Sequence, residues 1–390
     1  MLASEETVHR SYRTERVRYG APFIDMLANE IGTGKAQRIF VVAAPQLSGT
    51  LFFEQLKDLL GSRFCGAFSD IPAHVPHRAL FEGVRAAREA RTDSMIVLGG
   101  GSAIDTAKLI SLCLAYGIDD IDTLAGYSDL KRFDPSSPPA DDTVWVRSIA
   151  VPTTLSAAEF TWYAGVTDES VNVKRVVGHP LLIPRAVLYD PQLTMGVPLP
   201  LFLASGIKAI DHAAERIASL TAQPFSDAVS KEALQMLARS LPRIAQDPSD
   251  QQARLDCQLA AWLSILGGNS GVRVGASHAI GHMLGPHASM PHGYTSCTVL
   301  ASVMRWNRPA NHHRQRIIST ALGRDGLDAG DAIEQLVASL GLPTRLRDVN
   351  IPKPELRHIA RKTMEDSSIA SNPRKISSEE DVLEILEMAY

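Results

Sequence analysis

Four histidines and one lysine in the second half of the sequence have the types and the spacing that chemistry needs. His278, His282 and His292 stand at relative positions 0, 4 and 14, and His212 comes earlier in the chain. Together with one aspartate, such histidines would suit a divalent cation such as iron or zinc. The residue four positions before His212, however, is Lys208, a cation. Whether the protein uses a metal therefore depends on this one position.

A second motif begins where an apolar run ending at Leu98 meets three glycines and then a helical pattern. Glycines let a pyrophosphate approach the backbone, and the free N–H groups at a helix start favour its negative charge. Ser102 is a candidate N-cap with Asp105 three residues on, close to a capping box, and Lys108 would add a countercharge. The motif lacks the third glycine of GxGxxG because Ile104 stands there. It indicates phosphate binding, with a ligand-free capped turn as the alternative.

Two adjacent threonines, Thr153 and Thr154, follow another apolar run. Hydroxyl groups at the end of a parallel strand can bind a ligand in the crevice where such sheets hold nucleotides. A Thr-Thr turn by itself is structural more often than not. In combination with the glycine run, it predicts a nucleotide that lies across the strand ends.

The elements that must position these residues change character near residue 195. Before it, short apolar strands alternate with helical patterns, which indicates a mostly parallel sheet covered on both faces. The predicted strands are 38–44, 94–98, 147–151 and 185–189. Beyond it, helical spacing prevails, over 204–221, 226–243, 251–267, 275–285, 312–322, 329–340 and 354–365. We predict an α/β dinucleotide-binding domain over 1–195 and an all-helical domain over 196–390, joined by the proline-rich segment 190–200.

The composition is that of an ordinary globular enzyme. The 390 residues are 45% hydrophobic and 21% charged, with a formal net charge of −4. That charge argues against nucleic acid or an anionic membrane as the main partner. The four cysteines form no CxxC pair, and no run approaches the roughly 20 apolar residues that span a bilayer. The N-terminus has no apolar core of signal-peptide length, so we expect a cytoplasmic protein with reduced thiols.

The glycine run, the double threonine and the histidine array resemble, in order and separation, the iron-containing (group III) alcohol dehydrogenase superfamily. The resemblance extends from about residue 18 to the C-terminus. Three further stretches are most similar to maleylacetate reductase within that superfamily: 44–46, 183–191 and 371–374. The resemblance implies a nucleotide-binding domain, a helical domain and an active site in the cleft between them, a fold also similar to dehydroquinate synthase.

Hydride transfer between NAD(H) or NADP(H) and a small carbonyl or dicarboxylate substrate is the activity that the resemblance implies. It also implies a homodimer. The stretch after the first strand, 43–46, has no acidic residue to select NADH, so both cofactors stay open. The residues predicted to bind the cofactor are Gly99, Gly100, Gly101, Ser102, Asp105, Lys108, Thr153, Thr154 and Pro45.

Position 208 separates the metal-dependent members from the others. In the family that the sequence resembles, metal-dependent members have an aspartate at this place, which binds the metal. Maleylacetate reductases have a neutral residue there. At 4 Å, like unit charges repel by about 4 kcal/mol even at an effective dielectric near 20. Asp211 is no substitute, because it lies about 100° round the helix from His212. We therefore predict metal-free operation; if a metal is bound, its ligands are His212, His278 and His292.

Lys208 is instead predicted to place its charge where a carbonyl oxygen becomes negative during hydride attack. His212, His278 and His292 would line the pocket, one of them supplying a proton, with His282 as the second choice. Arg273 and His287 are weaker substrate-binding candidates. The alternative is that Lys208 faces solvent and that the histidines are only pocket lining inherited from the superfamily.

Three functions remain open at this point. The first is a metal-independent NAD(P)H-dependent reductase of an oxo-acid or another small carbonyl compound, similar to maleylacetate reductase. The second is an iron- or zinc-dependent alcohol dehydrogenase whose site tolerates Lys208. The third is a non-redox lyase-type enzyme on the same scaffold, which would consume no net NADH.

Overall fold

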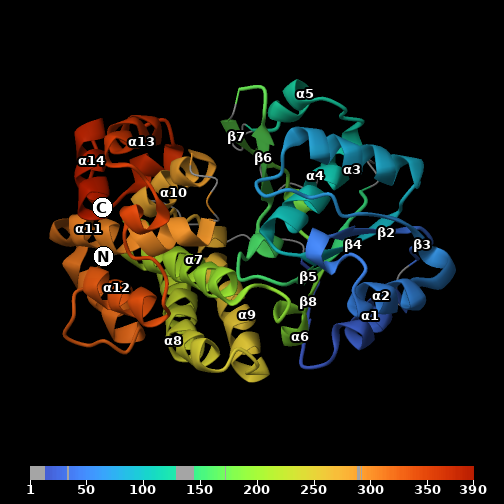
Figure 1. Ribbon diagram of the computed structural model, residues 1–390, viewed down its shortest axis with the longest axis horizontal. Coiled ribbons are helices and arrows are strands. Elements are labelled where there is room, and N and C mark those ends of the chain that lie inside the picture. Colours follow the sequence, from blue (N-terminus) through green and yellow to red (C-terminus); the bar gives the residue numbers. More distant parts are fainter. Residues whose placement is uncertain (1–13, 33–34, 129–144, 172, 288–289, 291) are drawn as a thin grey trace. The chain divides into compact units, whose positions relative to one another are not determined.

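The computed structural model describes the chain except residues 1–13, 33–34, 129–144, 172, 288–289 and 291 (Figure 1). The chain divides into two compact units: one ends at Val197 and the other begins at Pro198. The sequence places its boundary two residues earlier, between 195 and 196. We call the first the α/β unit and the second the helical unit, and describe each by itself.

Within its described residues, the α/β unit contains a six-stranded parallel sheet of order β1-β8-β5-β4-β2-β3. Its strands are β1 (Arg16–Tyr19), β2 (Ile39–Ala43), β3 (Phe64–Phe68), β4 (Ser94–Gly99), β5 (Ser148–Pro152) and β8 (Ala186–Tyr189). Strands β2, β4, β5 and β8 are fully buried. They are the four strands that the apolar runs predict. A separate antiparallel hairpin pairs β6 (Tyr163–Asp168) with β7 (Val173–Gly178).

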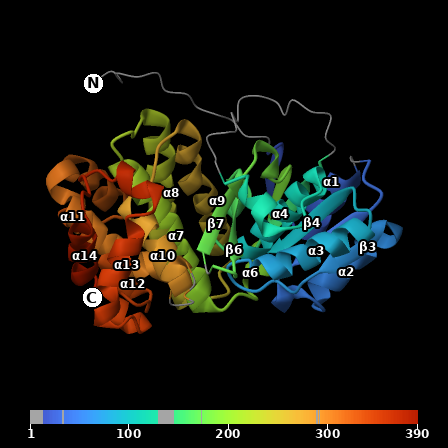
Figure 2. The ribbon, with the colours of Figure 1, turned by 90° about the horizontal axis from the view of Figure 1, so that it is seen from above.

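Helices cover both faces of this sheet, as expected for strands that are apolar on both sides. Helices α1 (Phe23–Gly32) and α2 (Leu51–Leu60) lie on one face, and α3 (His77–Glu89) and α4 (Gly101–Tyr116) lie on the other (Figure 1; Figure 2). Helix α4 packs against β2, β4 and β5, and its residues from Ala103 to Cys113 are almost all buried. The short helices α5 (Ile121–Ala125) and α6 (Pro191–Thr194) complete the unit.

The carboxyl ends of β2, β4 and β5 lie side by side in the middle of the sheet. Ala43 pairs with Leu98, and Gly99 pairs with Pro152. The chain leaves β2 for β3 on one side and later leaves β4 for β5 on the other. The sheet therefore has a topological switch point between β2 and β4, which is where open α/β sheets bind their ligands.

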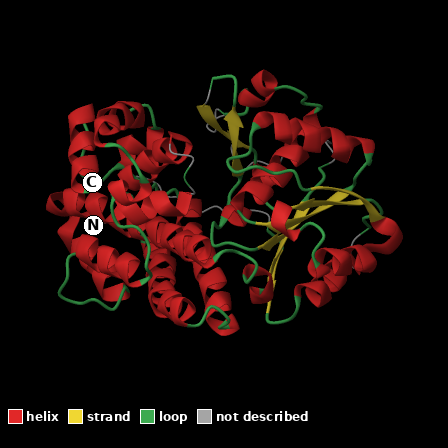
Figure 3. Cartoon of the chain, viewed as in Figure 1, coloured by secondary structure: helices red, strands yellow, loops and turns green. Residues whose placement is uncertain are grey.

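The helical unit has no strand among its described residues, which agrees with the predicted fold class (Figure 3). Its helices are α7 (Leu199–Ala218), α8 (Pro224–Gln246), α9 (Gln251–Leu266), α10 (Ala276–His287), α11 (His292–Ala321), α12 (Ala329–Ser339), α13 (Leu356–Thr363) and α14 (Glu379–Met388). Helix α7 packs against α8, α9 and α11, and α10 packs against α11 and α13. In the described part of the chain, no helix is both long enough and apolar enough to cross a bilayer.

Two helices differ from the sequence-based expectation. The sequence predicts a helix over 312–322 only. In the structure, α11 begins twenty residues earlier, at His292. The helix is kinked at Asn311, whose φ of −147° is not helical, and Pro309 lies just before it. The predicted helix is the part after this kink. Helix α14 is missed although Ser378 and Asp381 form a capping box at its start.

Candidate active site

Helix α7 presents Lys208, Asp211, His212 and Glu215 in succession. Their spacings of three, four and seven residues bring Lys208, Asp211 and Glu215 to one side of the helix. The helix is buried along most of its length, so these polar groups lie inside the helical unit rather than on its surface. Buried polar groups need partners, and Lys208, Asp211 and Glu215 each have one.

Lys208 forms an ion pair with Asp211 inside the helical unit. The Lys208 Nζ lies 3.1 Å from the Asp211 Oδ2, with the lysine side chain 15% exposed and the aspartate fully buried. Ser296 of α11 donates its hydroxyl to the same oxygen at 2.6 Å. This approach of α11 depends on Gly293, because a Cβ there would lie 2.5 Å from the backbone carbon of Ala204. Burial raises the pKa of Asp211, but Lys208 and its other partners outweigh burial and hold it below its usual value.

Glu215 fixes the start of α10 and the ring of His278. Its Oε2 accepts from the backbone N–H of Gly275 at 2.9 Å, and its Oε1 accepts from that of Ser277 at 2.9 Å. The His278 Nδ1 lies 2.7 Å from Oε2. Because a carboxylate only accepts, Nδ1 donates and the other ring nitrogen, Nε2, is left as the acceptor of neutral His278. A negative group at a helix start is also favoured by the helix dipole.

His212 and His278 lie face to face. Their ring centroids are 5.1 Å apart, with 27° between the planes. Burial lowers the pKa of both rings, and the charge of Lys208 lowers it further; for His212 the neighbouring His278 also contributes. The buried Nδ1 of His212 has no hydrogen-bond partner among the described residues. Both imidazoles are therefore neutral at neutral pH, with one lysine cation beside them.

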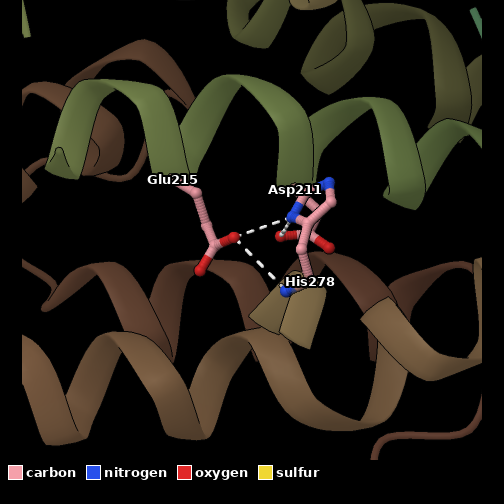
Figure 4. Close-up of side chains that lie close together, drawn as sticks. All are labelled: Asp211, Glu215 and His278. Atoms are coloured by element: carbon pink, nitrogen blue, oxygen red, sulfur yellow. Dashed lines mark hydrogen bonds and ion pairs between the residues drawn. The ribbon is translucent and has the colours of Figure 1, made fainter. Parts of the chain in front are cut away.

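A possible cation-binding group lies in the same place. Asp211, Glu215 and His278 are all buried, and each offers one ligand atom within 4.8 Å of the others, so the group could hold a divalent cation (Figure 4). It shares only His278 with the ligands that the sequence predicts for a bound metal.

Of the four other residues predicted to act here, the structure describes the side chains of two. The side chains of His287 and His292 lie outside the described residues. Arg273 is exposed and precedes α10, and its backbone N–H donates to the Thr221 hydroxyl at 3.5 Å. His282 follows His278 by one turn of α10, with ring centroids 6.4 Å apart. The structure therefore groups Lys208, His212, His278 and His282, and adds carboxylates that the sequence did not single out.

The glycine turn and the threonines form a second candidate site, which lies within the α/β unit. Gly99 has φ of +153°, and a Cβ there would lie 2.7 Å from the Ala103 Cβ. A Cβ on Gly100 would lie 2.8 Å from the Thr154 Oγ1. Thr153 is buried, and its hydroxyl has no hydrogen-bond partner among the described residues. Pro45 follows β2, next to the turn. Of the residues predicted to bind a nucleotide, Gly99, Gly100 and Thr154 thus lie together at the carboxyl ends of β4 and β5.

Three details of the phosphate-binding prediction need correction. Helix α4 begins at Gly101 with Gly100 as its N-cap, so the prediction of Ser102 as N-cap is wrong. The Asp105 carboxylate accepts the Gly165 N–H at 3.0 Å instead of closing a capping box. Lys108 is 1% exposed, so it cannot meet a phosphate at the surface of the turn. Its Nζ donates to the carbonyls of Ala158, Thr161 and Tyr163 at 2.5–3.0 Å. Lys108 therefore fastens the segment after the threonines to α4.

Sequence reasoning missed Glu215, Ser296 and Asp366. Glu215 carries a usable signal, because it lies seven residues after Lys208 and four after Asp211, on the same side of one helix. Ser296 and Asp366 have no such signal. Ser296 reaches Asp211 from α11, and Asp366 reaches the His282 ring from the segment that follows α13. Only tertiary structure brings them there.

Gly100→Ala tests the prediction that this turn binds a nucleotide, because the variant should weaken that binding selectively. The added methyl group would collide with the Thr154 side chain at 2.8–2.9 Å, and overpacking of this kind typically costs 1–3 kcal/mol. The KM for NADH should rise by roughly ten-fold, with a much smaller change in kcat. Steady-state kinetics would measure both. Gly196→Ala is the matched control, because a Cβ there meets only one atom, at 4.0 Å. Equal KM values in the two variants would contradict the assignment.

Comparisons with known proteins match the whole described fold. The model of the iron-containing alcohol dehydrogenase family matches residues 14–191, and that of the Fe-containing alcohol dehydrogenase family, C-terminal, matches 202–390. The dehydrogenase FUM7 of Gibberella moniliformis is 33% identical, over 96% of this chain and 95% of that protein. A maleylacetate reductase of Sphingobium indicum is 31% identical, again over 96% and 95%.

Among solved structures, an alcohol dehydrogenase from Oenococcus oeni superposes with a TM-score of 0.87 at 25% identity. The superposition covers 98% of this chain and 100% of that one. Its extent shows that both units have the folds of that protein.

Proposed function

The chain belongs to the iron-containing alcohol dehydrogenase family, and within it we propose a metal-independent NAD(P)H-dependent reductase of small carbonyl compounds, similar to maleylacetate reductase. Membership makes the protein an oxidoreductase. What we propose beyond membership is the metal independence, the cofactor and the substrate class. The main observation in support is the Lys208–Asp211 ion pair.

The described side chains do not suit the iron that the family name implies. Lys208 brings an ammonium into the group of possible ligands, and it occupies Asp211 Oδ2 together with Ser296. Glu215 is already used by backbone N–H groups of α10 and by His278. A dication would have to replace the lysine charge and displace these donors, and like charges at 4 Å repel by about 4 kcal/mol. We therefore derive no step through a metal.

Lys208 is the group that we propose to act on the substrate oxygen. Its ammonium is held in place by the Asp211 carboxylate, so it can meet a carbonyl oxygen without reorganisation as negative charge develops there. His212 and His278 are neutral and stack beside it, which leaves Lys208 as the cation of this group. A histidine then supplies the proton that converts the alkoxide to an alcohol.

The α/β unit suits a dinucleotide. Gly99 and Gly100 allow a tight turn between β4 and α4, because a Cβ at either position would collide with a neighbouring side chain, and the Thr153 hydroxyl is buried without a partner among the described residues. Backbone N–H groups at the start of α4 would hold the pyrophosphate. When bound, the reduced nicotinamide supplies the hydride. The end of β2 presents no acidic side chain between Ala43 and Gln46, so we propose that both NADH and NADPH are accepted.

The proposal predicts that turnover survives removal of metals. Protein dialysed against a strong chelator should oxidise NADH or NADPH in the presence of short oxo-acids, including maleylacetate, at the rate of untreated protein. The measurement is loss of absorbance at the reduced-nicotinamide band, with metal content determined on the same sample. A rate that falls on chelation and returns with iron or zinc would contradict metal independence.

A metal-dependent alcohol dehydrogenase is the second candidate. The buried group of Asp211, Glu215 and His278 favours it, since carboxylates and imidazole are ordinary ligands of iron and zinc. The same chelation experiment separates the two candidates. For either one, a substrate carboxylate could be bound by the exposed Arg273.

A further inference from the structure

His282 and Asp366 form a histidine–carboxylate pair, in addition to the pair of His278 and Glu215. The His282 Nδ1 lies 2.8 Å from the Asp366 Oδ2. The two pairs differ in exposure: the His282 side chain is 36% exposed, whereas that of His278 is 8% exposed. The rings of His212, His278 and His282 follow one another at centroid distances of 5.1 and 6.4 Å. His282 is the most exposed of the three, since His212 and His278 are buried.

The position of Asp366 is built by several contacts. Its other oxygen, Oδ1, accepts the backbone N–H of Ser368 at 2.8 Å, so the residue also caps a short 3₁₀ turn, Ser367–Ser371. The end of that turn is tied to the start of α10. Ser371 donates to the Val274 carbonyl at 2.7 Å, and Asn372 accepts the Ala276 N–H at 3.2 Å. The carboxylate is therefore held at a defined place against α10 rather than on a loose tail.

This geometry sets the tautomer of His282. Burial would raise the pKa of Asp366, but its hydrogen bonds to His282 and Ser368 lower it to about 2, so it is a carboxylate at neutral pH. A carboxylate only accepts, and Nδ1 must carry a hydrogen. In neutral His282 the remaining nitrogen, Nε2, is then the acceptor and the atom through which the ring exchanges a proton.

Carbonyl reduction needs such a group, because each turnover consumes one proton from solvent. We propose that Asp366 is a positioning residue that orients His282 as the proton donor of the reduction, an inference that rests on the proposed function. The hydride forms the new C–H bond and the C=O π electrons move to oxygen. The His282 imidazolium then gives its Nε2 proton to the alkoxide, and the neutral ring takes a proton from water. Of the three candidate histidines whose side chains are described (His212, His278 and His282), His282 combines a carboxylate partner with access to solvent.

The test is Asp366→Asn in the full-length protein. Asparagine is a good cap, so its oxygen keeps the Ser368 contact and its NH₂ group faces Nδ1. That donor forces the hydrogen of His282 onto Nε2, the wrong tautomer for proton uptake. We expect kcat to fall roughly 100-fold, with unchanged KM for NADH and unchanged thermal midpoint. Glu365→Gln is the matched control, because Glu365 is the exposed neighbour, paired with Lys362, and it should keep wild-type kcat.

A double variant shows whether Asp366 acts by orienting His282 or only by supporting the fold. If Asp366 acts through His282, then His282→Ala/Asp366→Asn should be no slower than His282→Ala alone. Added imidazole should restore part of the activity of His282→Ala, since the position is open to solvent. Additive losses in the double variant, or equal kcat in Asp366→Asn and Glu365→Gln, would overturn the inference. Failure of the proposed function would show earlier, as wild-type protein that reduces no carbonyl compound.

Discussion

Lys208→Met should lower kcat by about 10²–10³-fold while leaving the KM for NADH nearly unchanged. Methionine keeps the length of the side chain but removes the charge that we propose to stabilise the developing alkoxide, and loss of one such donor typically has this effect. Because the interaction is made in the transition state, kcat and kcat/KM for the carbonyl substrate should fall together. Steady-state kinetics with a saturating cofactor would measure both.

The Lys208 variant needs a control for the carboxylate that it leaves behind. The Asp211 Oδ2 would keep the Ser296 hydroxyl but lose the ammonium, and an uncompensated buried charge is destabilising. Lys208→Met/Asp211→Asn removes that charge as well. It should recover stability in thermal unfolding without recovering kcat. Lys231→Met, at an exposed lysine of α8, should behave as wild type. Wild-type turnover in Lys208→Met would refute the role of the ammonium.

Glu215→Ala should destabilise the helical unit and abolish activity together. The variant removes the acceptor of the Gly275, Ser277 and His278 backbone N–H groups and of the His278 ring. Each orphaned buried donor costs about 1–3 kcal/mol, so the three backbone groups alone imply a loss of roughly 3 kcal/mol or more. Urea or thermal unfolding followed by circular dichroism would measure it.

Two comparisons make the Glu215 result specific. Glu232→Ala removes an exposed glutamate of α8, whose side chain is 53% exposed, and should change stability by less than about 0.5 kcal/mol. Glu215→Gln keeps the size of the side chain but turns an NH₂ group toward donors, so it should also be destabilising. A Glu215→Ala protein as stable as Glu232→Ala would show that the carboxylate does not hold α10.

Much of the fold is predictable because the sheet centre is apolar on both sides. Strands β2, β4, β5 and β8 stand out in the sequence for that reason. The strands β1 and β3 lie at the two edges of the sheet and are only partly buried, so their side chains carry a weaker pattern. The kink at Asn311 likewise hides the first part of α11, because the helical periodicity is interrupted there.

The sequence predicted those parts of the candidate site whose residues lie on the same helix. Lys208 and His212 share a helix, and His278 and His282 share another, so their spacing could be read directly. The identity of Lys108 misled the prediction, since a lysine after a glycine turn resembles a phosphate ligand, whereas burial among carbonyl oxygens makes it a structural residue. The contacts to Ser296 and Asp366 join residues 85 and 84 positions apart, and no local pattern encodes them. The homodimer stays a prediction.

The attachment of α10 has a consequence for how the protein matures. Glu215, which orients His278, comes 63 positions before it in the sequence. On the other side, Ser371 bonds to Val274, just before α10, across 97 positions. Contacts so distant in sequence close late in folding, since loop entropy must be overcome first. A newly made chain can therefore become compact before its α10 histidines are oriented for catalysis. For this protein, the first appearance of turnover during refolding would report the completion of the helical unit, later than the gain of helix content.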